Sequence, residues 1–188
     1  MPNNFNNCIG CPYCQQIHLP QLQKSLVNSP LSIDIGNNAD TLLVFQSPGT
    51  DEWGGGVLTV SGNRIPIDSK NRYSAAARMR NSMARKGVVR TDYDITEAVQ
   101  CFPGKKSNGR DKRPSVNSMM CCLHHLVNDL SVKKYNKIVA FGAVAYQMTT
   151  QAVGIVNTNN VIKFMQPLPI FARHPSGWIS NNNLDASY

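Results

Sequence analysis

The stretch from residue 94 to residue 126 constrains the fold of this chain more than any other. An apolar, β-like run in it ends in Cys101, a basic loop over Lys105–Arg113 follows, and a helix that starts at Pro114 leads to Cys121-Cys122. A strand that ends in one thiol and a helix that carries another can direct both thiols at one metal centre. Such a centre would fix how the strand and the helix lie against each other.

Two more thiols lie near the N-terminus, in the run Cys8-Ile-Gly-Cys11. A site of four thiolates would tie the start of the chain to its middle, and by residue type zinc and an iron–sulfur cluster suit it equally. Six cysteines without a secretion signal are more typical of metal ligands or buried thiols than of disulfides.

The charge of the chain favours a polyanionic partner. Its formal net charge is +8, from 19 lysines and arginines against 11 acidic residues, and the cations concentrate in Arg64–Arg90 and Lys105–Arg113. This balance indicates nucleic acid first, with a merely soluble basic protein as the alternative.

A chain of 188 residues with 41% hydrophobic content supports one core, so we expect a single domain over residues 1–188. Residues 1–30 would form a cysteine-containing segment packed on the core, and residues 179–188 a tail. The start of the chain has no signal-peptide pattern and no window approaches the ~18 apolar residues of a membrane span. We therefore expect a cytoplasmic, monomeric protein that does not bind membranes.

Apolar runs that alternate with helical patterns predict a parallel sheet covered by helices on both faces, an α/β fold. The expected strands cover residues 41–45, 94–100, 136–141, 161–165 and 168–172. The expected helices cover residues 19–29, 69–86, 115–130 and 143–151.

In such open sheets the ligand site gathers at the carboxyl ends of the strands. Three polar loops follow predicted strands, over Gln46–Gly56, Glu97–Gly104 and Arg173–Trp178. We expect these loops to converge.

Six short motifs follow one another along nearly the whole chain. They are Cys8-Ile-Gly-Cys11-Pro12, Phe45-Gln-Ser-Pro-Gly-Thr-Asp-Glu52, Thr96-Glu-Ala-Val-Gln-Cys101-Phe-Pro103, Pro114 through Leu126, Gly142-Ala-Val-Ala145 and His174-Pro-Ser176. In this order they resemble the motifs of the uracil-DNA glycosylase superfamily, and within it the family 4 branch, which carries an iron–sulfur cluster. The resemblance implies a three-layer α/β/α fold with a central, mainly parallel sheet of about four strands.

The resemblance also implies a set of metal ligands. A four-iron, four-sulfur cluster would be held by Cys8, Cys11, Cys101 and Cys122. Zinc is the alternative metal, and Cys14 or Cys121 can replace a proposed ligand. The cluster would clamp the N-terminal segment to the sheet.

The first polar loop has an ordinary and a functional interpretation. It is either a plain turn set by Pro48-Gly49 or a loop around a flipped base and its sugar, with Asp51 or Glu52 stabilising the cationic sugar. The family has a glutamate where this chain has Gln46. The residues that would surround the base are Gln46, Ser47, Pro48 and Gly49.

The last loop also resembles the family. His174 alone is most simply a loop histidine, but the resemblance implies that it donates a hydrogen bond to the departing base. Ser176 would bind a phosphate, and Trp178 is either an exposed aromatic or the wedge that fills the gap left by the extruded base. The aromatic that stacks on the base is left open between Trp53 and Tyr73. Phosphate contacts are expected from Arg110, Lys112, Arg113 and Arg173.

Glu97 stands where the family motif has the asparagine that reads uracil. An ionised carboxylate only accepts hydrogen bonds, so it repels the O4 of uracil and suits the amino group of cytosine. The alternative is that Glu97 pairs with a nearby cation and that the enzyme still cuts uracil.

These residues predict a monofunctional DNA glycosylase that flips a base and leaves an abasic site, acting on modified cytosines of phage DNA as a defence enzyme. One alternative is a repair glycosylase for uracil or another deaminated base. Another is an inactive iron–sulfur or zinc module that binds nucleic acid, which the missing acid at Gln46 favours.

Overall fold

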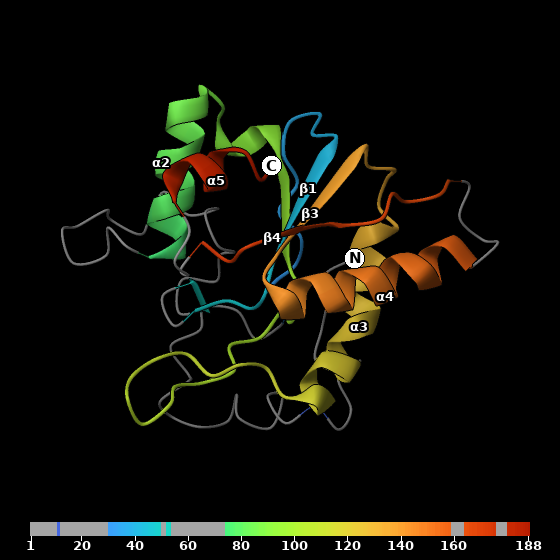
Figure 1. Ribbon diagram of the computed structural model, residues 1–188. Coiled ribbons are helices and arrows are strands. Elements are labelled where there is room, and N and C mark those ends of the chain that lie inside the picture. Colours follow the sequence, from blue (N-terminus) through green and yellow to red (C-terminus); the bar gives the residue numbers. More distant parts are fainter. Residues whose placement is uncertain (1–10, 12–29, 50–51, 54–73, 159–163, 176–179) are drawn as a thin grey trace.

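A four-stranded parallel sheet forms the centre of the protein (Figure 1). The computed structural model describes residue 11 and residues 30–49, 52–53, 74–158, 164–175 and 180–188. The strand order is β2-β1-β3-β4. The strands are β1 (Thr41–Phe45), β2 (Asp94–Glu97), β3 (Lys137–Phe141) and β4 (Ile170–Ala172).

β1 lies in the middle of the sheet, and its sequence shows why. Val44 pairs with Thr96 of β2 on one side and with Ala140 of β3 on the other. A strand flanked on both edges and covered on both faces needs apolar side chains throughout, which a continuous run such as TLLVF supplies. Phe45 stacks on Phe141, with ring centroids 4.8 Å apart and planes 9° from parallel.

Helices cover both faces of the sheet, so the predicted α/β/α arrangement is confirmed. α2 (Ala75–Lys86) and α5 (Asn181–Asp185) lie together on one side, and α3 (Val116–Leu130) packs against α4 (Ala143–Thr158) on the other (Figure 1). A short 3-10 helix, Arg90–Asp92, leads into β2. Among the described helices, none has both the length and the apolar character that crossing a bilayer requires.

The ends of α2 and α3 follow from their sequences. The side chain of Ser74 accepts a hydrogen bond from the Ala77 amide, and the side chain of Ser115 accepts one from Ser118. Gly87 ends α2 in the left-handed conformation, with a φ of 68°.

Several predicted elements differ in extent. α4 continues past residue 151 to Thr158 because Ala152, Val153 and Val156 extend its buried face. β4 begins at Ile170, not at residue 168, since Pro169 cannot donate a ladder hydrogen bond. Residues 164–165 of the predicted strand 161–165 are not in a strand, while residues 161–163, residues 69–73 and the predicted helix 19–29 lie outside the described residues.

The segment expected to be a tail contains α5, which is tied to α2. Arg85 forms an ion pair with Asp185 at 2.7 Å, and Ser82 donates a hydrogen bond to the same carboxylate. The Tyr188 hydroxyl donates to Ser82 at 2.7 Å, and its ring packs edge-on against Phe141. Through these contacts the C-terminal residues link α2 to β3 of the sheet.

Candidate active site

The carboxyl ends of the four parallel strands bring the predicted loops to one edge of the sheet. Beyond the strands, the Val99 amide donates to the Gln46 carbonyl at 3.0 Å, so the loops after β1 and β2 run side by side. The Gly142 amide donates to the Ala172 carbonyl at 2.8 Å, which joins the ends of β3 and β4.

The loop after β1 is compact. Gln46 and Ser47 are half-buried, Pro48 is buried, and the Trp53 amide donates to the Gly49 carbonyl at 2.9 Å. A Cβ added to Gly49 would lie 2.5 Å from a carboxylate oxygen of Glu52, so the glutamate side chain folds back over its own loop.

The structure describes only some of the residues predicted to surround the base. Asp51 lies outside the described residues, as does Tyr73, one of the two candidates for stacking on the base. Trp53, the other candidate, is only 5% exposed and belongs to the hydrophobic core. Its burial assigns Trp53 a packing role in this structure.

Glu97 ends β2, pairs in register with Phe45, and is fully buried. A carboxylate in such a place costs free energy unless donors or a positive charge compensate it. Glu97 therefore lies at the strand end beside the first polar loop.

His174 follows β4 and packs on the backbone after β3. A Cβ added to Gly142 would lie 3.3 Å from the His174 Cβ, and Gly142 has a φ of 92°, which an L side chain rarely adopts. Burial lowers the pKa of His174 to about 4, so its imidazole is neutral at pH 7 and offers one N–H donor. Ser176 and Trp178 lie outside the described residues.

The basic loop folds back on itself as a hairpin. Lys105 pairs with Asp111 across an isolated bridge, and the Lys112 amide donates to the Gly104 carbonyl at 2.8 Å. The Asp111 carboxylate lies 3.4 Å from the Cβ position of Gly49, which places the hairpin beside the first loop. The predicted phosphate contacts, all of them exposed, are Arg110, Lys112, Arg113 and Arg173.

The described cysteines gather around the start of α3. Cys11, Cys101 and Cys122 are buried, and a hydrogen bond with Cys11, followed by burial and the neighbouring Cys101, raises the pKa of the Cys122 thiol. Cys11 also contacts Cys121. Cys8 and Cys14 lie outside the described residues. Within the described part of the chain, no group of three Cys, His, Asp or Glu side chains is placed so that it could hold a metal ion.

One buried polar cluster was not predicted. Thr96 and Gln100 both donate to the Asp129 carboxylate, at 2.5 and 2.7 Å, and burial raises the pKa of Asp129 to about 7. The sequence does carry a signal for it, because Asp129 falls on the face of α3 that also holds Cys122 and Leu126. An acid on an apolar helix face points to a buried partner.

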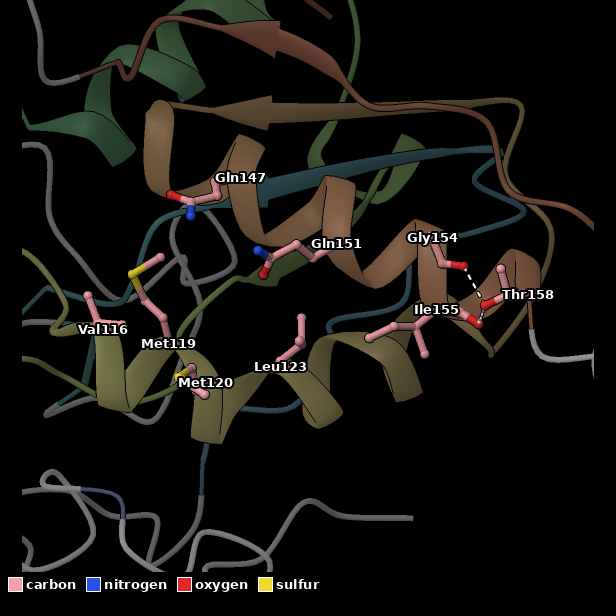
Figure 2. Close-up of a pocket in the computed structure, with 9 residues that line it drawn as sticks. All are labelled: Val116, Met119, Met120, Leu123, Gln147, Gln151, Gly154, Ile155 and Thr158. Carbon is pink, nitrogen blue, oxygen red and sulfur yellow. Dashed lines mark hydrogen bonds between the residues drawn. The ribbon is translucent and has the colours of Figure 1, made fainter.

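An apolar groove of about 710 Å³ lies elsewhere, between α3 and α4, and Figure 2 shows its lining. None of the described residues that line it is an acid or a base, and they belong to α3 and α4, away from the loops at the strand ends. The lining residues are Val116, Met119, Met120, Leu123, Gln147, Gln151, Gly154, Ile155 and Thr158.

Comparison with known proteins identifies the family. No curated protein matches the chain. The model of the uracil DNA glycosylase superfamily matches residues 34–186, a span that contains all four strands and the loops at their carboxyl ends. The chain belongs to the uracil-DNA glycosylase superfamily.

Proposed function

We propose that this protein is a monofunctional DNA glycosylase that flips a base out of DNA and hydrolyses its N-glycosidic bond. Membership of the superfamily supports a glycosylase. The observation that carries the proposal is His174, a half-buried, neutral imidazole held at the carboxyl edge of the sheet against Gly142. A preset N–H donor at that edge suits a reaction in which a base departs as an anion.

The proposed reaction breaks the bond between the sugar C1′ and the base nitrogen. The electron pair leaves with the base, whose developing negative charge takes a hydrogen bond from His174. The carboxylate of Asp51 or Glu52 stabilises the cationic sugar, and a water molecule adds its hydroxide to C1′ and releases a proton. The products are a free base and an abasic site.

We propose that Glu97 sets the preference for the base. Its complete burial at the end of β2 supports a role inside a pocket. Because an ionised carboxylate accepts hydrogen bonds only, a cytosine-type base, with its amino donor, fits better than uracil. A cytosine modified at C5, as in some phage genomes, is the proposed target, and defence against such DNA is the proposed role.

We also propose a four-iron, four-sulfur cluster on Cys8, Cys11, Cys101 and Cys122. The gathering of buried thiols around Cys11 supports it. By residue type zinc suits the same thiolates, so the preference for a cluster rests on the resemblance of the cysteine motifs to the iron–sulfur branch. When bound, the cluster would supply a rigid link between the N-terminal segment and β2.

DNA would lie along the hairpin of residues 104–112 and the loop at Arg173. The exposed cations there can neutralise phosphates on either side of an extruded nucleotide. The location is proposed to be cytoplasmic, where such DNA is met.

The proposal is tested with one oligonucleotide context that contains uracil, cytosine or a C5-substituted cytosine, as single strand and as duplex. Formation of abasic sites is measured for the unmodified protein and for Glu97→Asn. We expect cleavage of the substituted cytosine, with Glu97→Asn shifting activity toward uracil. Efficient uracil cleavage that Glu97→Asn leaves unchanged would support the repair alternative, and binding without cleavage would support the inactive module.

A further inference from the structure

Arg78 of α2 reaches the loop that carries His174. Its guanidinium Nη1 donates a hydrogen bond to the Pro175 carbonyl at 2.5 Å, across 97 positions of sequence. A hydrogen bond from a charged donor is roughly twice as strong as one between neutral groups. The bond holds the carbonyl of the residue that immediately follows His174.

His174 is therefore held from two sides. On one side its Cβ lies against Gly142, whose own amide is bonded to Ala172 at the end of β4. On the other side Arg78 holds Pro175. Between these two contacts the backbone that carries the imidazole has little freedom to shift.

α2 is itself a fixed support for Arg78. The Arg78 amide donates to the Ser74 carbonyl at 3.0 Å in the capped first turn of the helix. At the other end, Ser82 and Arg85 bind Asp185 of α5. A side chain that extends from a capped helix anchored to α5 can hold a loop in one place.

We propose that Arg78 is a positioning residue of the glycosylase reaction, whose guanidinium keeps the His174 imidazole in place to donate its N–H to the departing base. The inference rests on the proposed function but concerns a residue outside every motif that marks the superfamily in this chain. Arg78 would act on the reaction by positioning His174, and it would not contact the substrate.

The first experiment needs no activity. The titration of His174 is followed by NMR in the unmodified protein, in Arg78→Met, in Arg78→Lys and in Lys134→Met, with the signal assigned from His174→Ala. Lys134→Met is the control, because it removes one positive charge at an exposed position outside α2 and the loop of His174. We expect the pKa of His174 to stay low in the control, to rise toward 6.5 in Arg78→Met, and to be partly restored by lysine. An unchanged titration in Arg78→Met would overturn the proposal.

The second experiment follows the reaction on whichever oligonucleotide is cleaved. Misplacing a reacting group by about 1 Å can cost about 100-fold, so Arg78→Met should lower kcat by up to that factor while KM changes little. In the His174→Ala background Arg78→Met should cause no further loss, since both act through one imidazole. Additive losses would show that Arg78 acts independently of His174 and would overturn the proposal. If no oligonucleotide is cleaved, the proposed function fails, and the titration alone still decides the role of Arg78.

Discussion

Asp129 carries a carboxyl group inside the core, between α3 and the end of β2. It accepts hydrogen bonds from Thr96 and Gln100, and burial, the larger effect, raises its pKa to about 7 despite them. Gln100 also accepts a hydrogen bond from the Leu31 amide through its carbonyl and lies next to Cys101. One acid thus fixes the segment that separates Glu97 from the proposed cluster.

The raised pKa predicts how stability depends on pH. Because the folded-state pKa lies above the unfolded value of 3.8, the folded protein binds the proton more tightly. The stability that this proton provides is complete below about pH 4 and is lost as the pH rises through 7. Asp129→Asn removes this dependence. Urea unfolding is measured at pH 5 and at pH 8. Between these two values the free energy of unfolding should fall more for the unmodified protein than for the variant. An equal change in both proteins would contradict the raised pKa of Asp129.

At the scale of elements, a single glycine after β3 sets the space for His174. Gly142 has a φ of 92° and its Cβ position is 3.3 Å from the histidine, whereas Gly87 has a φ of 68° with no atom of its surroundings within 4 Å. A substitution at either glycine would strain the backbone. Only at Gly142 would the new methyl group also contact His174.

Alanine at these glycines should therefore separate stability from activity. Both Gly142→Ala and Gly87→Ala should cost about 1–2 kcal/mol of stability, from the left-handed backbone. Only Gly142→Ala should also displace His174 and lower turnover. Thermal unfolding and kcat are measured on both variants, and equal turnover in the two would show that the contact with His174 is not critical.

Much of the fold is readable from sequence because local patterns agree with tertiary packing. The run Thr41–Phe45 is an uninterrupted apolar strand, and Ser74 and Ser115 cap α2 and α3 as expected of helix starts. α5 has the same kind of cap at Ser180, but only Leu184 of its residues is buried, so it has no apolar pattern that predicts a helix. Its place depends on the ion pair between Asp185 and Arg85 of α2. The contact between Arg78 and Pro175 was equally hidden, because nothing in the sequence relates residues 97 positions apart.

At the scale of the whole molecule, Cys11 brings a thiol from near the start of the chain into the centre of the fold. Cys11 is buried against α3, where Cys122 meets Cys101 from the end of β2. The cysteine motifs predict which thiols could bind a metal centre. They do not distinguish a single ion from a cluster, because both use thiolate ligands. That choice depends on how far apart the thiolates lie.

A cluster on these thiols has two measurable consequences. Protein purified without air should be brown and contain iron and sulfide, and Cys101→Ala should lose both and become strongly destabilised, because the binding energy of such a centre is folding energy. Val132→Ala, at an exposed position beyond the end of α3, serves as the control that should keep the metal. A colourless protein with stoichiometric zinc would contradict the cluster.

The central claim, that His174 assists the departure of a base from DNA, is tested most directly by one comparison. Abasic-site formation on the oligonucleotide set is measured for the unmodified protein and for His174→Ala, together with the affinity of each for the same DNA. The account predicts that the variant loses about 100- to 1,000-fold in turnover while its affinity is kept. Equal losses of binding and turnover, or abasic sites formed equally well without the imidazole, would contradict it.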